Sequence, residues 1–312
     1  MTNLAKTTSL NRYFTSGPHL SESISQNETA PEAEQTRGRI YDRDALTYSN
    51  TFENPFKRQT IRTIEWLTGK VSIVRMITEF ERRPAVKGHG FWRACLNVMR
   101  IELHTPLEQL ENIPATGPVI VVANHPHGMV DGMILAELIG NRRRDYRILT
   151  RSVLTGIDPE AAAFLIPVPF PHEEDAQQKF LEMRKQAMAH LKAGGVVALF
   201  PAGGVAASET MYGPAVDAEW NVFTAKMIRT SGATVVPCFF PGQNSRAYQM
   251  ANQISATLRQ GLLIHEIVKA CGKPQAPIVG SAIDHSEVET RLSNPREFMA
   301  WLRDHTLSLG KS

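Results

Sequence analysis

A series of short, almost wholly apolar runs alternates with helical patterns from Pro106 onward, and it constrains the fold more than any other feature. The apolar runs predict strands over 118–124, 146–150, 196–200, 234–240 and 277–280. Helical periodicity predicts helices between and after them over 131–139, 174–192, 220–230 and 251–270. Uniformly apolar strands are typical of a sheet covered on both faces, and strand–helix alternation favours parallel pairing. The predicted fold class is α/β, a largely parallel mixed sheet flanked by helices.

The first 105 residues have a different character. Residues 1–50 are rich in Ser, Thr, Asn, Gln and Glu, which predicts a disordered arm. Residues 51–105 are expected to form an amphipathic helical segment, with one helix from Pro55 to Arg83 and a shorter one within 88–100. These helices could pack on the domain formed by 106–312, or lie in a bilayer interface with Phe91 and Trp92 as anchors.

The overall charge and the cysteines exclude several classes of protein. A net charge of +3 over 312 residues does not predict nucleic-acid binding, although local basic patches could meet anionic lipid. The three cysteines form no Cys-x-x-Cys pair, so neither a disulfide framework nor a zinc site is indicated. The N-terminus lacks a secretory pattern, and no apolar run reaches the roughly 18 residues of a spanning helix. We therefore expect a cytoplasmic protein that contacts the inner face of the membrane peripherally.

Three of the predicted strands end in loops with prolines, small residues or polar groups, at 124–131, 201–206 and 241–246. In the first loop His125 follows the strand, Gly128 allows a tight turn, and Asp131 opens the next helix. An aspartate that binds one imidazole nitrogen leaves the other free to take a proton. Because no Ser or Cys nucleophile lies nearby, this pair predicts general-base catalysis on a substrate hydroxyl.

Other interpretations of the same loop stay open. His125 could be a hydrogen-bonded loop residue, and Asp131 could be a helix N-cap. His127 competes for the role of base, and both histidines could be metal ligands together with Asp131. No further His or Cys cluster supplies the remaining ligands, so no metal is predicted. A serine hydrolase is disfavoured because the chain has no Gly-x-Ser-x-Gly motif.

The three loops together resemble those of the glycerolipid (lysophospholipid) acyltransferases, and most closely their hemolysin-like branch. That branch has the pattern Asn-His-Pro-x-Gly-x-x-Asp/Glu-Gly, which matches Asn124, His125, Pro126, Gly128, Asp131 and Gly132. Its Phe-Pro-Ala-Gly motif matches Phe200, Pro201, Ala202 and Gly203. Its Val-Pro-Val-x-Phe-x-Gly-x-Asn-Ser-Arg motif resembles the end of the fourth strand, with Asn244 and Arg246. Three motifs in order are far more specific than one.

The resemblance implies an acyltransferase domain over 106–312 that acts in lipid metabolism. His125 would deprotonate a hydroxyl of a lysophospholipid-like acceptor, with Asp131 orienting the ring. The donor would be acyl-CoA or acyl-carrier protein, and no cofactor is expected. Backbone N–H groups of Gly203 and Gly204 are candidates to bind the oxyanion. The further candidate substrate-binding residues are Asn124, Gly128, Arg151, Phe200, Pro201, Asn244 and Arg246.

The chain also departs from the main group of that family. Ala202 replaces the glutamate of the main motif, no arginine follows Gly204, and the run 164–170 ends without the expected arginine. These departures make a glycerol 3-phosphate acceptor doubtful and favour weighing a lyso-aminolipid such as lyso-ornithine lipid. Arg151 and Arg246 remain to meet a phosphate or carboxylate, although Arg246 could equally cap a surface loop. A non-catalytic lipid-binding or lytic protein is the alternative from another class.

Overall fold

The computed structural model describes Tyr41 and residues 47–51, 53–151, 158–170, 173 and 175–311. All of them belong to one unit, Thr36–Ser312. Apart from Tyr41 and residues 47–50, the predicted disordered arm over 1–50 lies outside the described residues.

Six strands of the described chain form one sheet in the order β3-β2-β4-β1-β7-β8. They are β1 (Val119–Ala123), β2 (Tyr146–Arg151), β3 (Leu165–Val168), β4 (Val196–Leu199), β7 (Thr234–Phe239) and β8 (Ile278–Val279). All neighbours pair in parallel except β7 and β8. The predicted fold class is confirmed. Because β1, β4 and β7 run parallel in register, their carboxyl ends bring the three motif loops to one edge of the sheet.

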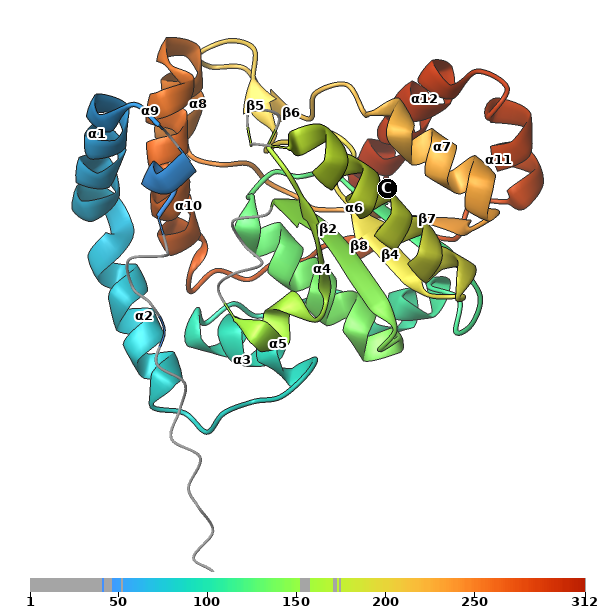
Figure 1. Ribbon diagram of the computed structural model, residues 1–312, viewed down its shortest axis with the longest axis horizontal. Coiled ribbons are helices and arrows are strands. Elements are labelled where there is room, and N and C mark those ends of the chain that lie inside the picture. The colour runs from blue at the N-terminus through green and yellow to red at the C-terminus, as the bar shows by residue number, and fades with distance from the viewer. Residues whose placement is uncertain are drawn as a thin grey trace, which may run out of the picture. The chain divides into compact units, whose positions relative to one another are not determined.

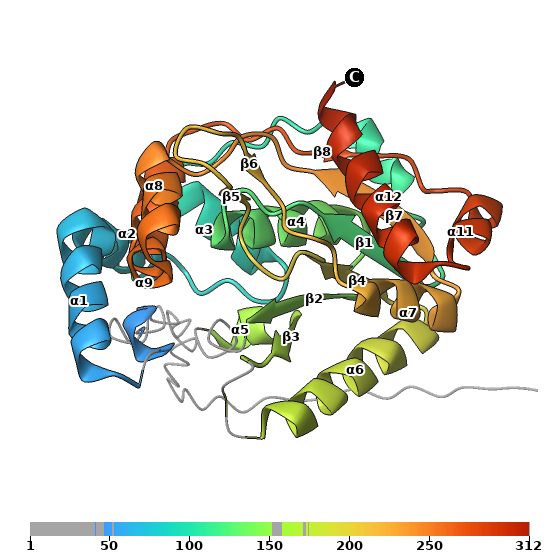
Figure 2. The ribbon, with the colours of Figure 1, turned by 90° about the horizontal axis from the view of Figure 1, so that it is seen from above.

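Helices cover both faces of this sheet (Figures 1 and 2). Along β1, Val119, Val121 and Ala123 pack in one core cluster with α3 (Gly90–Val98), α4 (Met129–Arg142) and α10 (Leu263–Ala270). Ile120 and Val122 point to the other face, into a cluster with α6 (Ala176–Lys192), α7 (Val222–Ser231) and α12 (Pro295–Ser308). Each fully buried Val or Ile side chain stabilises the fold by roughly 1.5–3 kcal/mol.

Several parts of the fold differ from the sequence prediction. The single helix expected over 251–270 is divided into α8 (Arg246–Ile254), α9 (Ala256–Gly261) and α10. The first break occurs at Ser255, which is extended and whose side chain accepts a hydrogen bond from the Thr257 N–H of α9. Strand β3 was not predicted; it contains Pro167, which an edge strand tolerates. The hairpin β5–β6 (Ala207–Ser208, Ala215–Val216) and the helices α5 (Pro159–Ala162), α11 (His285–Arg291) and α12 were also not predicted.

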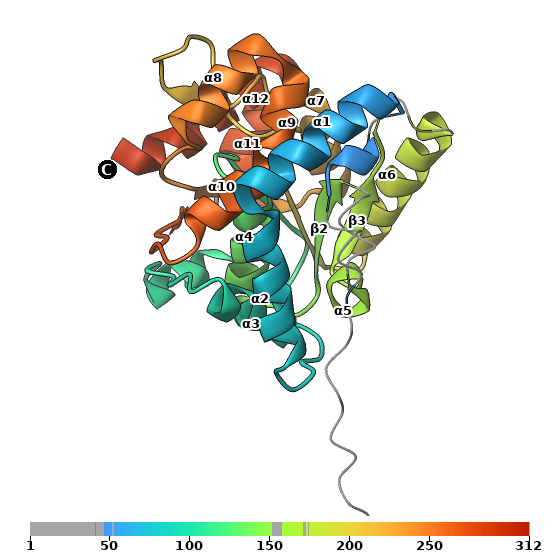
Figure 3. The ribbon, with the colours of Figure 1, turned by 90° about the vertical axis from the view of Figure 1, so that its left-hand side faces the viewer.

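The N-terminal helical segment packs on this domain (Figure 3). It consists of α1 (Pro55–Glu65), a π-helical turn (Trp66–Lys70) and α2 (Val71–Glu81). Phe91 and Trp92 of α3 are buried in the core, which supports packing over the role of bilayer anchors. The extra residue of a π turn shifts the buried face of a helix. Leu67 in this turn and Val71 directly after it are exposed, although both are apolar. No helix in the described part of the chain is long and apolar enough to cross a membrane.

Candidate active site

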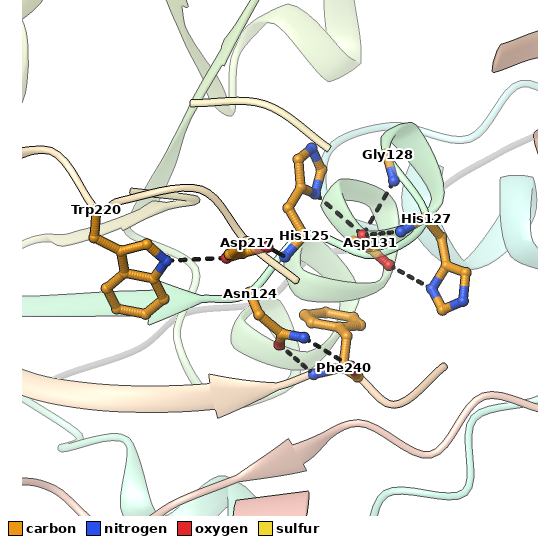
Figure 4. Close-up of polar contacts among 8 residues, drawn as sticks. All are labelled: Asn124, His125, His127, Gly128, Asp131, Asp217, Trp220 and Phe240. Carbon is orange, nitrogen blue, oxygen red and sulfur yellow. Dashed lines mark hydrogen bonds and ion pairs between the residues drawn. The ribbon is translucent and has the colours of Figure 1, made fainter. Parts of the chain in front are cut away.

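His125 and Asp131 meet at the carboxyl end of β1 (Figure 4). Asp131 is the third residue of α4, two positions further into the helix than expected, because α4 begins at Met129 after Gly128 (φ 73°). The carboxylate of Asp131 is fully buried. It accepts hydrogen bonds from His125 Nδ1 (3.1 Å), His127 Nδ1 (3.0 Å), His127 N (2.7 Å) and Gly128 N (3.1 Å).

These donors keep Asp131 ionised. Burial by itself raises the pKa of a carboxyl group, but the hydrogen bonds from the two histidine rings, and the positive charge that the rings carry when protonated, outweigh it. The pKa of Asp131 therefore lies below its usual range. Because an ionised carboxylate can only accept, the Nδ1 atoms of His125 and His127 carry the protons. Each ring has its Nε2 left to accept a proton.

The cavity next to the sheet distinguishes the two histidines. His125 lines it, with its ring stacked on Phe200 at 3.9 Å between centroids, whereas His127 does not line it. The His127 ring lies instead against Gly242, where a Cβ atom would come within 3.0 Å of Nε2. The two rings point in different directions from Asp131 (Figure 4). Of the two candidate bases, only His125 lines this cavity.

The cavity measures about 720 Å³ and is mostly apolar. Its apolar lining includes Ile73, Phe91, Trp92 and Met133, and also Phe170, Phe180, Met183 and Phe223. Gly203, Gly204, Arg184 and Asn221 line the cavity and are also exposed, so the cavity opens to solvent between them. The arrangement can hold long aliphatic chains with His125 at the wall.

The glycine turn after β4 lies at this opening. Gly203 has φ 68°, and its N–H donates to Phe200 O at 2.9 Å, so this donor is engaged within the turn. The N–H of Gly204 donates to no acceptor among the described residues. Of the two predicted oxyanion donors, Gly204 is therefore the one with a free hydrogen.

Arg151, at the end of β2, also faces the cavity. It donates to Gly203 O at 2.8 Å and to Pro169 O at 3.4 Å, and its guanidinium lies over the Phe170 ring at 4.9 Å. Burial lowers the pKa of the guanidinium, which nevertheless stays protonated near neutral pH. Within the described residues Arg151 forms no ion pair, so N–H donors remain for an anionic group of a substrate.

Three other predicted binding residues do not line the cavity. Asn124 bonds the backbone of Phe240 through both side-chain atoms, at 2.9 and 2.7 Å, and so joins the ends of β1 and β7. Asn244 is buried, and its amide nitrogen has no hydrogen-bond partner in the described part of the chain. Arg246 is exposed and donates to Gly213 O at 2.8 Å, which supports its interpretation as a loop-capping residue. The remaining predicted residues, Gly128, Phe200 and Pro201, line the cavity.

Asp217 is a site residue that the sequence did not reveal. Its Oδ1 accepts the backbone N–H of His125 at 3.1 Å, and its Oδ2 accepts Trp220 Nε1–H at 3.0 Å. The backbone carbonyl of His125 in turn accepts Ala206 N–H at 2.8 Å. The segment 206–217 thus holds the His125 peptide on both sides. Asp217 is 92 residues away from His125 and belongs to none of the recognised motifs, so no sequence signal pointed to it.

Metal binding has no support in the described part of the chain, where no group of three His, Cys, Asp or Glu residues could hold an ion.

Comparison with known proteins gives the family. The acyltransferase family model matches residues 56–276, which is more than half of the chain. The chain belongs to the acyltransferase family. This acyltransferase is 30% identical over 168 residues to a lyso-glycine lipid O-acyltransferase of Phocaeicola vulgatus, covering 53% of this chain and 56% of that protein. It is 29% identical over 173 residues to a lyso-glycine lipid O-acyltransferase of Bacteroides thetaiotaomicron, covering 54% and 59%.

The matched region therefore spans somewhat more than half the length of these relatives. Among solved structures, the chain is similar to the 1-acyl-sn-glycerophosphate (LPA) acyltransferase PlsC from Thermotoga maritima. The sequence identity is 13% and the TM-score 0.46, with 84% of this chain and 83% of that chain covered.

Proposed function

We propose that this protein transfers a fatty acyl group from a thioester donor to the hydroxyl of a lyso-lipid, with His125 as general base. The observation that carries the proposal is the position of His125. Its Nδ1 is bound to the buried Asp131, and its ring lies at the wall of a large apolar cavity. A proton acceptor beside space for aliphatic chains fits a reaction between two lipidic substrates.

The reaction needs no covalent enzyme intermediate. His125 Nε2 takes the proton of the acceptor hydroxyl while the oxygen attacks the thioester carbonyl. The tetrahedral oxyanion lies near the N–H of Gly204. Its collapse breaks the C–S bond, and the leaving thiolate takes the proton back from the imidazolium. Asp131 stabilises that imidazolium, and a base of this kind accelerates a reaction about 100- to 10,000-fold.

For the acceptor we propose a lyso-aminolipid whose head group carries a free carboxylate. Two relatives are named for lyso-glycine lipid. The chain also lacks the glutamate and the arginines of the main phosphate-binding motifs. Arg151 lies at the cavity, and its guanidinium can bind a single carboxylate. A lysophospholipid is the competing acceptor.

An assay with purified protein tests the proposal. Labelled acyl-CoA and acyl-carrier protein are each supplied as donors with lyso-glycine lipid, lyso-ornithine lipid or lysophosphatidic acid. We expect product with the lyso-aminolipids, loss of product in His125→Ala, and retained product in His127→Ala, the matched control. Absence of product from every pair, or equal loss in both variants, would contradict the proposal. Product from lysophosphatidic acid alone would replace the proposed acceptor.

We also propose that the helical segment 55–81 rests on the membrane. The side chains of Phe56 (79% exposed), Trp66 (64%) and Leu67 (72%) reach solvent from α1 and the π turn, beside the exposed Lys57 and Arg58. Aromatic and aliphatic side chains next to basic ones are typical of interfacial helices. Sedimentation with phosphatidylglycerol vesicles should fall in Trp66→Ser/Leu67→Ser and stay unchanged in the control Tyr212→Ser, which alters an equally exposed aromatic residue elsewhere. Equal sedimentation of all three proteins would refute it.

A further inference from the structure

Two helices beside the opening of the cavity carry more basic than acidic residues. Helix α6 has four basic residues, Lys179, Arg184, Lys185 and Lys192, and one acidic residue, Glu182. Helix α7 has two basic residues, Lys226 and Arg229, and no acidic residue. Lys179 pairs with Glu173, whereas Arg184, Lys185 and Lys226 form no ion pair among the described residues. Such a surface attracts an acidic partner.

The charges are arranged in two adjoining stripes that include exposed aliphatic side chains. Leu181, Arg184 and Lys185 are three and four positions apart and share one face of α6, while Val222 and Lys226 share one face of α7. Leu181 is 58% and Val222 46% exposed. The two helices lie side by side (Figures 1 and 2), and the Arg184 guanidinium lies 5.0 Å from the centre of the Phe223 ring. We call Leu181, Arg184, Lys185, Val222 and Lys226 together the α6–α7 face.

The α6–α7 face borders the route to His125. Arg184 belongs to the face and is also an exposed residue of the cavity lining. Asn221, immediately before Val222, is exposed and lines the cavity as well, and its N–H donates to Pro201 O at 3.0 Å. Pro201 follows Phe200, on which the His125 ring stacks. A molecule bound to the α6–α7 face is therefore next to the opening that leads to the base.

We propose that the α6–α7 face docks an acidic acyl-carrier protein, which presents its thioester at this opening. The inference rests on the proposed acyl transfer and names the donor. Unpaired basic side chains give complementarity to an acidic protein, and Leu181 and Val222 supply apolar contact between them. An acyl chain on a flexible arm can enter the cavity from there while its carrier stays outside.

Other occupants suit this face less well. A membrane-bound helix presents a wide apolar face, but the apolar residues Met183 and Ala187 of α6 and Met227 and Ile228 of α7 are buried in the core. Among the described residues, the exposed aromatic side chains Phe56 and Trp66 lie on α1 and the π turn, and Tyr212 lies between β5 and β6, so none of them belongs to α6 or α7. The nucleotide of acyl-CoA would need a compact site that binds its phosphates. The three basic side chains of this face are instead spread over the outer surfaces of two helices.

A charge-reversal variant of residues outside the cavity tests the proposal. Lys185→Glu/Lys226→Glu should raise KM for acyl-carrier protein about 10- to 100-fold with little change in kcat, because lost complementarity slows association. KM for acyl-CoA should stay within about twofold of wild type, since the cavity is unchanged. Lys87→Glu, the same charge reversal at an exposed residue outside the face, is the matched control and should leave KM for both donors unchanged.

Binding is measured separately by titrating acyl-carrier protein into each variant without acceptor, at low and high salt. Loss of binding in the double variant but not in Lys87→Glu supports the docking face. Unchanged binding, an equal rise of KM for acyl-CoA, or a loss of phosphatidylglycerol vesicle binding in place of carrier binding would each overturn it. If neither donor gives product while the carrier still binds through the face, the acyl-transfer proposal fails and the docking face stands.

Discussion

Two loops at the same edge of the sheet, 124–131 after β1 and 240–246 after β7, both carry motif residues, yet they have different surroundings. The first places His125 at the wall of the cavity. The second faces away from it: Arg246 bonds Gly213 O, and Gln243 accepts the N–H of Ala215 at 2.9 Å, so both hold the β5–β6 hairpin. That hairpin leads into Asp217, which bonds the His125 backbone. One loop is thus placed for chemistry, and the other supports the element that positions it.

The largest effect is expected in the first loop. Asp131→Asn replaces the acceptor of both histidine rings with an amide and allows the wrong tautomer of His125. We expect kcat to fall about 10,000-fold, the size seen when a carboxylate that orients a catalytic histidine is changed to its amide. Steady-state kinetics with a thermal melt as the folding control measures this effect. A loss below about tenfold in a folded variant would remove Asp131 from the mechanism.

A smaller effect is expected where the two regions meet. Asp217→Ala removes the acceptor of the His125 N–H, and we expect kcat to fall about 100-fold with little change in KM, because the base is displaced while the cavity is kept. Asp217→Asn retains an oxygen acceptor and should recover part of the activity. Trp220→Phe is the matched control, since it removes only the partner of Oδ2. Equal losses in Asp217→Ala and Trp220→Phe would show that the contact with His125 has no special role.

Arg151 and Arg246 are expected to differ in their effect on the KM for the acceptor. Arg151→Ala should raise KM for a carboxylate-bearing lyso-lipid about 10- to 100-fold, the cost of a lost charge-assisted hydrogen bond. Arg246→Ala should change KM by less than about threefold and lower Tm by about 2 °C, because its bond to Gly213 only fixes a loop. Kinetics with varied acceptor decides between them. The reverse order of effects on KM would place the head group beside the second loop.

The smallest effect is expected in the pH dependence of the free energy of unfolding. Because the pKa of Asp131 is lowered in the folded protein, its carboxylate contributes stability that is fully present above the unfolded pKa of about 3.9. This contribution is lost as pH falls through the lower folded pKa. The difference in unfolding free energy between wild type and Asp131→Asn should therefore shrink below about pH 4. Urea unfolding at several pH values measures it, and a difference that grows with acidity would contradict the ionised state.

The sequence predicted the elements whose pattern of side chains lies within a few consecutive residues. Strands were expected over 196–200 and 234–240 because all of these residues except Thr234 are apolar, and β4 and the centre of β7 are buried as such runs predict. Strand β3 was not predicted; it has only four residues and lies at the edge of the sheet. The division of 251–270 was not predicted because the cap at Ser255 is a single hydrogen bond. The hairpin β5–β6 was not predicted because each of its strands has only two residues. Hydrogen bonds to side chains of α8 and of Gln243 hold it in place.

The sequence by itself determined the α/β architecture and the pairing of a histidine with Asp131, since apolar periodicity and short spacing decide both. It predicted His125 as the base and left His127 as a competitor, because both lie within six residues of Asp131 in the chain. The tertiary structure decided which ring faces the cavity, because Phe200 of one strand end and Gly242 of another direct the two rings apart. It alone brought Asp217 to the backbone of His125 and placed Arg151 rather than Arg246 at the cavity. Such contacts join segments far apart in the chain, and their geometry depends on packing that no local pattern encodes.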